Sequence, residues 1–245
     1  MNAVPGAPFD AIDVLAGQLR DLVVAMSEDQ SDGVKVPRVV QFAAAAMPGA
    51  EHASISAMHG HGRPKTLAAT GEVALLIDRI QHEAGEGPGV QALIQSDLVW
   101  SNDLSKDRQW PRFAPRAVEA AGVRSLVSYR LFLSEEQRAA LNFYSSCPYA
   151  FDQLALDIGT IFAAYASLTV LNEVHRDKAM NLERALESSR EIGTAIGILM
   201  ARELCTSEQA FARLREASQQ THRKLRDIAA DVKQTGALPA LTHSR

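Results

Sequence analysis

The chain has 245 residues, of which 47% are hydrophobic and 22% charged, a composition that excludes fibrous and largely disordered proteins. Its net charge is -4, but the part from Arg176 onward has 12 Lys/Arg against 9 Asp/Glu, so a mildly basic C-terminal part of charge +3 follows an acidic body. A charge of this size permits nucleic-acid binding without indicating it.

Two distant cysteines, Cys147 and Cys205, form neither a metal-binding pair nor a disulfide framework, which is typical of a reducing compartment. We see neither a signal peptide nor a run of about 20 apolar residues that would span a bilayer. The sequence therefore predicts a cytoplasmic protein that does not enter the membrane.

The first elements are two helices followed by a hairpin. Apolar residues at helical spacing predict helices over 9–27 and 36–50. Alternating residues then predict two strands, 52–60 and 61–71, joined at Gly60-His61-Gly62. His59 and His61 could face the same way and hold a metal, but without a further ligand nearby we favour a structural turn, and we expect no metal site or cofactor.

A helix, a glycine-rich bend at residues 85–89 and a shorter helix are predicted over 72–96, and the bend matches no phosphate-binding loop. A short strand, a helix over 115–121 and a strand over 125–133 follow, and a second hairpin returns through Leu141, Phe143 and Tyr144. Helices that alternate with antiparallel hairpins indicate an α+β fold in which helices flank an antiparallel sheet.

From Asp152 onward the pattern is helical without an interrupting proline until Pro239. Few large apolar residues occur over 172–191, as is typical of a solvated connector between domains that can pair with its copy in a dimer. Two more helices are predicted after the connector helix stops near Leu204. One is capped by Thr206 or Ser207, with Gln209 at the capping-box position, and the other ends at Gly236.

These three C-terminal helices can bury one small core. The predicted inward positions are Ile192, Ala195, Ile196 and Leu199 on the first helix, Ala210, Phe211, Leu214 and Ala217 on the second, and Leu225, Ile228, Ala229 and Val232 on the third. Met200 is also expected in the core. By default, the seven cations Arg190, Arg202, Arg213, Arg215, Arg223, Lys224 and Arg226 form a solvated face that phosphate groups could contact.

Two glycines, Gly193 and Gly197, interrupt the connector helix, although each costs about 1 kcal/mol relative to Ala. They lie beside the inward stripe, near Arg190, Met200 and Arg202. Bare backbone lets another group approach closely, either a second helix or a ligand. Spacing alone favours helix packing.

The C-terminal sequence resembles the ANTAR domain, a three-helix RNA-binding module of bacterial antitermination regulators, over about residues 180–236. The resemblance is carried by the A-x-G-I-L-M run at 195–200, the S-x-x-x-A-F-x-x-L-R run at 207–215 and the R-K-L-R-D-I-A run at 223–229. Many members have Lys before the second glycine, where this chain has Ile196.

The preceding part, about residues 10–172, is similar to GAF sensor domains through "ASISAMHGHGRPKTLAATG", "GEGPGVQAL", "DLSKDRQWPRF" and "GVRSLVSYRLFL". Related bacterial sequences often have Cys where this chain has Gly89, so any redox chemistry of that cysteine is absent here. GAF-ANTAR pairing is familiar among actinobacterial regulators, and the resemblance implies a cytoplasmic homodimer.

We therefore expect a GAF-like sensor over 10–172, a connector and ANTAR domain over 173–236, and a tail over 237–245. The expected function is a signal-responsive, non-enzymatic regulator that binds hairpins in nascent RNA and promotes antitermination. A small molecule or a protein would act as the signal at the sensor. Projected from the resemblance, the candidate RNA-binding residues are Arg190, Gly197, Met200, Arg202, Arg215, Arg223 and Lys224.

Two alternatives remain open. The C-terminal helices could serve protein interaction and dimerisation without binding RNA. Alternatively, they could bind DNA as a helix-turn-helix, although the third helix shows no recognition face rich in Asn, Gln and Arg. No catalytic motif or forced carboxylate pair supports an enzyme.

Overall fold

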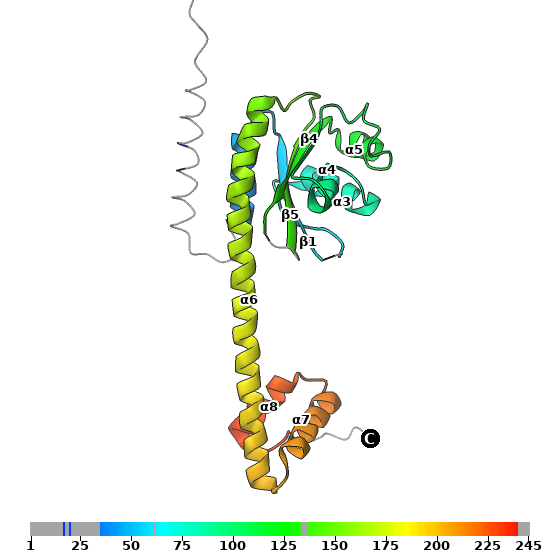
Figure 1. Ribbon diagram of the computed structural model, residues 1–245. Coiled ribbons are helices and arrows are strands. Elements are labelled where there is room, and N and C mark those ends of the chain that lie inside the picture. Colours follow the sequence, from blue (N-terminus) through cyan, green and yellow to red (C-terminus); the bar gives the residue numbers. More distant parts are fainter. Residues whose placement is uncertain (1–16, 18–19, 21–34, 61, 134–136, 240–245) are drawn as a thin grey trace, which may run out of the picture. The chain divides into compact units, whose positions relative to one another are not determined.

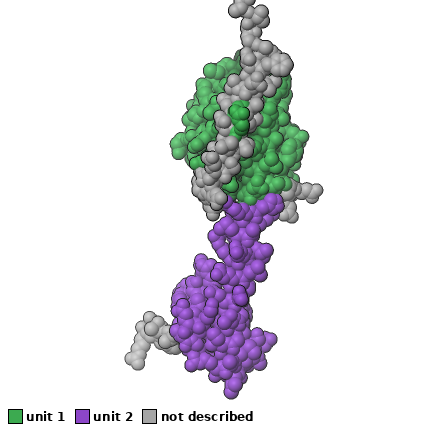
Figure 2. Space-filling view, turned by 90° about the vertical axis from the view of Figure 1, so that its left-hand side faces the viewer, with its two compact units in different colours: residues 1–173 green, residues 174–245 purple. Residues whose placement is uncertain are grey.

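The computed structural model describes Gly17, Arg20 and residues 35–60, 62–133 and 137–239. Apart from Gly17 and Arg20, which are helical, the helix expected over 9–27 lies outside the described residues, as do His61 of the histidine pair and the end of the tail. The chain divides into two compact units, residues 1–173 and 174–245 (Figure 2).

The first unit is built on a five-stranded antiparallel sheet, which confirms the two predicted hairpins and the α+β class. Its strand order is β2-β1-β5-β4-β3. The strands are β1 (His52–His59), β2 (Lys65–Ala69), β3 (Leu98–Ser101), β4 (Ser125–Leu131) and β5 (Gln137–Ser145). Strand alternation divides β5 between two faces, so Leu141 and Phe143 point to one side while Asn142 and Tyr144 point to the other.

Helices cover both faces of this sheet (Figure 1). On one side lie α2 (Lys35–Ala46) and the first part of α6 (Gln153–Glu203). On the other lie α3 (Glu72–Ala84), α4 (Pro88–Ile94) and α5 (Ala114–Ala121). The main core fills the second interface, where Ile77, Leu93, Phe113 and Tyr144 are fully buried.

Helix α6 packs closely on the sheet at its start. A Cβ on Gly159 would overlap the ring of Tyr129, whose hydroxyl donates to the Leu156 carbonyl at 3.0 Å. Phe162 meets Phe42 of α2 edge to face, with ring centroids 5.9 Å apart. By length and composition α6 could cross a membrane, but half of its apolar window is buried in the protein, as in the core helix of a soluble domain.

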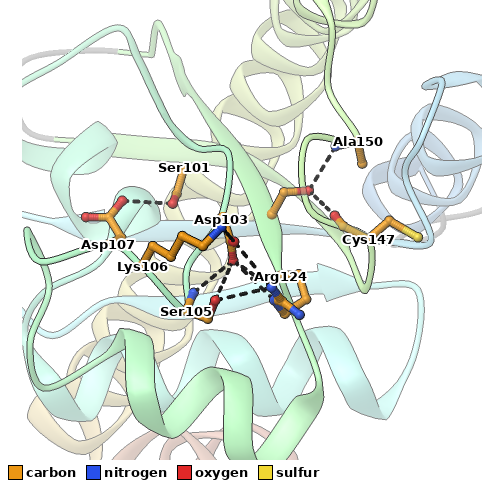
Figure 3. Close-up of polar contacts among 9 residues, drawn as sticks. Ser101, Asp103, Ser105, Lys106, Asp107, Arg124, Cys147 and Ala150 are labelled. Carbon is orange, nitrogen blue, oxygen red and sulfur yellow. Dashed lines mark hydrogen bonds and ion pairs between the residues drawn. The ribbon is translucent and has the colours of Figure 1, made fainter.

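The loop after β3 is held by Asp103 (Figure 3). This carboxylate accepts from the Ser105 hydroxyl at 2.7 Å and from Arg124 Nη2 at 3.0 Å, and Lys106 Nζ lies 3.2 Å away. The hydrogen bond from Ser105, together with those from Arg124 and Lys106, holds the pKa of Asp103 well below its usual range. Because Asp103 forms ion pairs with both Lys106 and Arg124, the cluster holds the loop against the start of β4.

The second unit contains three helices, as predicted: the remainder of α6, α7 (Ser207–Thr221) and α8 (Leu225–Thr235). Thr206 accepts from the Gln209 backbone N–H, and the Gln209 side chain accepts from the Thr206 N–H, which confirms the capping box. The fully or nearly fully buried core consists of Ala195, Leu199, Ala210, Leu214, Ala217, Ile228, Ala229 and Val232.

Candidate functional site

The interior of the first unit contains a buried carboxylate that sequence reasoning missed. Asp78 on α3 is fully buried and accepts hydroxyl hydrogen bonds from Ser54 and Ser56 at 2.9 Å and from Thr66 at 2.6 Å. Tyr144 donates a fourth. Burial, followed by the charge of Asp78, raises the pKa of Tyr144 well above its usual value, so this phenol stays a donor.

This network extends to α4. Gln81 Nε2 donates to the Tyr144 hydroxyl at 3.4 Å, and Gln81 Oε1 accepts from the backbone N–H of Gly89 at 2.8 Å. Asn142 Nδ2 donates to the Ser54 hydroxyl at 3.1 Å. The space between the sheet and α3 is therefore filled by side chains of the chain itself. The signal for Asp78 in the sequence was a lone acidic residue on the apolar face of 72–84.

Gly89 is required by this packing. A Cβ there would lie 2.9 Å from Asn142 Oδ1 and 3.1 Å from the Gln81 amide, closer than normal contact. We therefore expect Gly89→Cys to lower the free energy of unfolding of the first unit by about 1–3 kcal/mol. Urea unfolding followed by tryptophan fluorescence measures it, because both tryptophans, Trp100 and Trp110, belong to this unit.

Gly71→Cys is the matched control. The same side chain is added at an extended backbone position where nothing lies within 4 Å. Equal urea midpoints for the two variants would contradict the packing argument.

In the second unit, the two helical glycines face open space. Among the described residues, nothing beyond the helix's own backbone and chain neighbours lies within 4 Å of a Cβ added at Gly193 or Gly197. Spacing favoured packing against another helix, and no helix in the described part of this chain packs there, so a helix of a second copy and a ligand both remain as explanations. At about 100° per residue, Arg190, Gly193, Gly197 and Ala201 share one exposed face of α6. We call these four residues the glycine face, and no other element in the described part of the chain covers its two glycines.

The candidate cations fall into two groups. Arg223 pairs with Asp231 at 2.6 Å, and that hydrogen bond raises its pKa, while Arg202 Nη1 donates to the Thr235 carbonyl at 3.4 Å. Within the described residues, Arg190, Arg215 and Lys224 form no ion pair, although all three are exposed. The exposed cations Arg213 and Arg226 pair with Glu203 and Asp227.

The structure separates some residues that the sequence analysis grouped. Arg202 follows Gly197 by five residues, so it lies roughly 140° around α6 and contacts the end of α8 instead of joining the glycine face. Met200 is near that face and 37% exposed. Arg215 is on α7, while Arg223 and Lys224 lie in the α7–α8 connection.

Two apolar residues expected in the core are at the surface. Phe211 is 41% exposed and Met200 37%, because both sit at the edge of an inward stripe whose centre is filled by Ala210, Leu214 and Leu199. Leu204 was missed: it is 93% exposed with a left-handed backbone (φ 50°) immediately after α6. Phe211 is one helical turn from Arg215, so an exposed ring and an unpaired guanidinium are neighbours.

Comparison with known families assigns both units. Residues 36–170 match the GAF domain and residues 180–232 match the ANTAR domain. No curated protein sequence matches the chain.

Solved structures resemble the first unit. The GAF domain of a phosphoenolpyruvate-protein phosphotransferase from Coxiella burnetii aligns with TM-score 0.54 and 14% identity, over 69% of this chain and 98% of that one. The corresponding domain from Acinetobacter aligns with a TM-score of 0.52 and 16% sequence identity, over 69% of this chain and 98% of that one. Free methionine-R-sulfoxide reductase from Neisseria meningitidis aligns with a TM-score of 0.52 and 12% sequence identity, over 72% of this chain and 99% of that one. Identities this low show a common fold and nothing more.

Proposed function

We propose, because the chain belongs to the GAF domain family and continues into an ANTAR domain, that it is a signal-responsive regulator that binds paired hairpins in nascent RNA. ANTAR domains are RNA-binding modules of antitermination regulators. Binding would hold the transcript in a form that prevents a terminator from forming. The protein would act in the cytoplasm, without catalysis, as regulators of the actinobacterial GAF-ANTAR type do.

The observation that carries this proposal is the bare glycine face of α6. Two glycines in an exposed helix cost about 1 kcal/mol each, and in the described part of the chain no contact with another element offsets that cost. An RNA backbone or an unstacked loop base can approach such a surface closely, and hairpin loops present bases that a small domain can read. This chain has Ile196 beside the glycine, so the cationic contact must come from other positions.

Three cations suit phosphate contacts best. Arg190 lies on the glycine face, Arg215 is beside the exposed ring of Phe211, and Lys224 is the N-cap residue of α8, where the helix dipole also favours an anion. Phe211 and Met200 offer surfaces on which bases can stack. Arg202 instead contacts the C-terminal residue of α8, Thr235, and Arg223 pairs with Asp231 within that helix, so RNA contact by either would first break an internal bond.

We further propose that α6 pairs with α6 of a second copy. Leu154, Ile161 and Leu168 are exposed at seven-residue intervals. In the second unit Leu182 and Leu186 are also exposed, four residues apart; in the sequence Leu182 follows Leu168 by two seven-residue intervals, with His175 at the position between them. Exposed apolar positions that repeat every seven residues are typical of one half of a coiled-coil seam, and Leu186 adds a single position of the other half. We call these five residues the leucine stripe.

The test is binding of the full chain to three matched nucleic acids: tandem RNA hairpins, the corresponding DNA duplex and a scrambled RNA. We expect the hairpins to bind at least tenfold more tightly than either control. Binding to none of them would favour the alternative function, a protein-interaction regulator whose C-terminal helices only dimerise. Preference for the duplex would favour DNA recognition.

Salt dependence identifies the cations involved. In Arg215→Gln/Lys224→Gln, the slope of log affinity against log salt should fall by about 1.5 to 2, because two phosphate contacts are lost. Lys233→Gln, which removes an exposed charge near the end of α8, is the control and should leave the slope nearly unchanged. An unchanged slope in the double variant would remove Arg215 and Lys224 from the RNA-binding surface.

A further inference from the structure

A groove of about 550 Å³ lies between β2 and α3 on the first unit. It is separate from the filled interior around Asp78 and opens to solvent. The residues that line it come from the β1–β2 connection, β2 and α3: Arg63, Pro64, Thr66, Leu75, Arg79, His82 and Glu83.

The groove contains two positively charged side chains that no ion pair neutralises in the described part of the chain. Arg63 and Arg79 are exposed, and neither forms an ion pair with any residue in the described part of the chain. Glu83 also lines the groove, but its carboxylate accepts from Arg116 Nη2 of α5 at 2.7 Å. Two guanidinium groups that face one groove can hold a carboxylate or phosphate with paired hydrogen bonds.

One residue that lines the groove also belongs to the buried network. Thr66 lines the groove and donates to Asp78 Oδ2 at 2.6 Å, and Asp78 in turn joins α3 to β1 and β5. Burial lowers the pKa of His82, although the charge of Asp78 opposes this shift, so the ring is neutral near pH 7 and keeps one N–H donor and one acceptor. A molecule in the groove would therefore touch residues that are tied to the centre of the sheet.

We propose that this groove binds a small molecule with a phosphate or carboxylate group, held by Arg63 and Arg79 and hydrogen-bonded by His82. This assigns a chemical class to the signal of the sensor unit and a place where it enters. A bound anion would also lie beside Thr66, whose hydroxyl donates to Asp78 of the buried network. Anion binding by this unit does not depend on RNA binding by the second one.

The experiment is calorimetric titration of the full chain, without RNA, at constant ionic strength. The probes are inorganic phosphate, adenosine monophosphate and malonate, with sodium chloride as the blank. We expect at least one probe to bind saturably, with a dissociation constant below about 1 mM. Binding of the two phosphates alone identifies a phosphate ligand, and binding of malonate alone a carboxylate.

Two variants locate the site. Arg63→Gln/Arg79→Gln should weaken binding at least tenfold, whereas Arg108→Gln, which removes an exposed charge from the loop after β3, should not. Thermal unfolding without anion should be similar in all three proteins, since these side chains are exposed. Heats that match the sodium chloride blank for every probe, or equal affinity in the wild type and the double variant, would overturn the proposal.

Discussion

Asp78→Ala is expected to lower the free energy of unfolding of the first unit by about 4 kcal/mol or more. The substitution removes the acceptor of four hydroxyl groups, three of which (Ser54, Ser56 and Tyr144) are almost completely buried. Each buried donor left without a partner costs about 1–3 kcal/mol. The hydrogen bonds that join α3 to β1, β2 and β5 are lost at the same time.

Urea unfolding followed by tryptophan fluorescence measures this effect in the full chain. Trp110 is almost completely buried and reports the packing of the same interface. Asp78→Asn keeps the shape and one acceptor oxygen, so its loss should be smaller, about 1–3 kcal/mol. Glu119→Ala, an exposed carboxylate on α5, is the control and should change stability by less than about 0.5 kcal/mol. A midpoint for Asp78→Ala equal to that of the control would refute the structural role of the network.

Leu182→Glu/Leu186→Glu is expected to convert a dimer into a monomer. In the proposed pairing these side chains would be buried between two copies, where each is worth about 1.5–3 kcal/mol. The double substitution removes two buried apolar side chains from each copy and would bring four carboxylates together in the dimer. Sedimentation equilibrium should give twice the 26.5 kDa chain mass for the wild type and the chain mass for the variant.

Asn181→Glu/Ser188→Glu adds the same charge to another side of α6 and serves as the control. It should remain a dimer. A wild type that sediments as a monomer, or a stripe variant that stays dimeric, would contradict pairing through the leucine stripe.

Local signals were sufficient to predict most of the elements. Thr206 and Gln209 fixed the start of α7 because a capping box needs only four consecutive residues. Gly85, Gly122 and Gly236 end α3, α5 and α8 in the left-handed conformation, which glycine adopts without strain. Each of these features depends only on residues that are close in the sequence, so the sequence alone is enough to predict it.

The site could be predicted only in part, because its properties depend on distant residues. Whether a cation is free depends on partners such as Asp231 for Arg223, which become neighbours only when α7 and α8 fold together. Phe211 was assigned to the core because helical spacing groups it with Ala210, Leu214 and Ala217 on one apolar stripe, yet the small core is already filled by aliphatic residues. The position of Arg202 away from Gly197 does follow from helical geometry, and the five-residue spacing should have shown it.

The buried network illustrates the same limit. Helical periodicity alone would make Asp78 an anomaly, since an acidic residue is rarely buried. Its stability depends on hydroxyls from β1, β2 and β5, up to 66 residues away in sequence. Only the sheet register brings those donors to one place.

The most direct test of the RNA-binding surface is the affinity of Gly197→Leu for the tandem RNA hairpins. A Cβ at this position meets no other element among the described residues, and Leu favours helix more than Gly, so the fold should be as stable as the wild type or more so. Because the bulk blocks close approach, we predict at least a tenfold loss of affinity, about 1.4 kcal/mol. Ala212→Leu, an exposed position on α7, should bind normally. Wild-type affinity in Gly197→Leu would contradict the account.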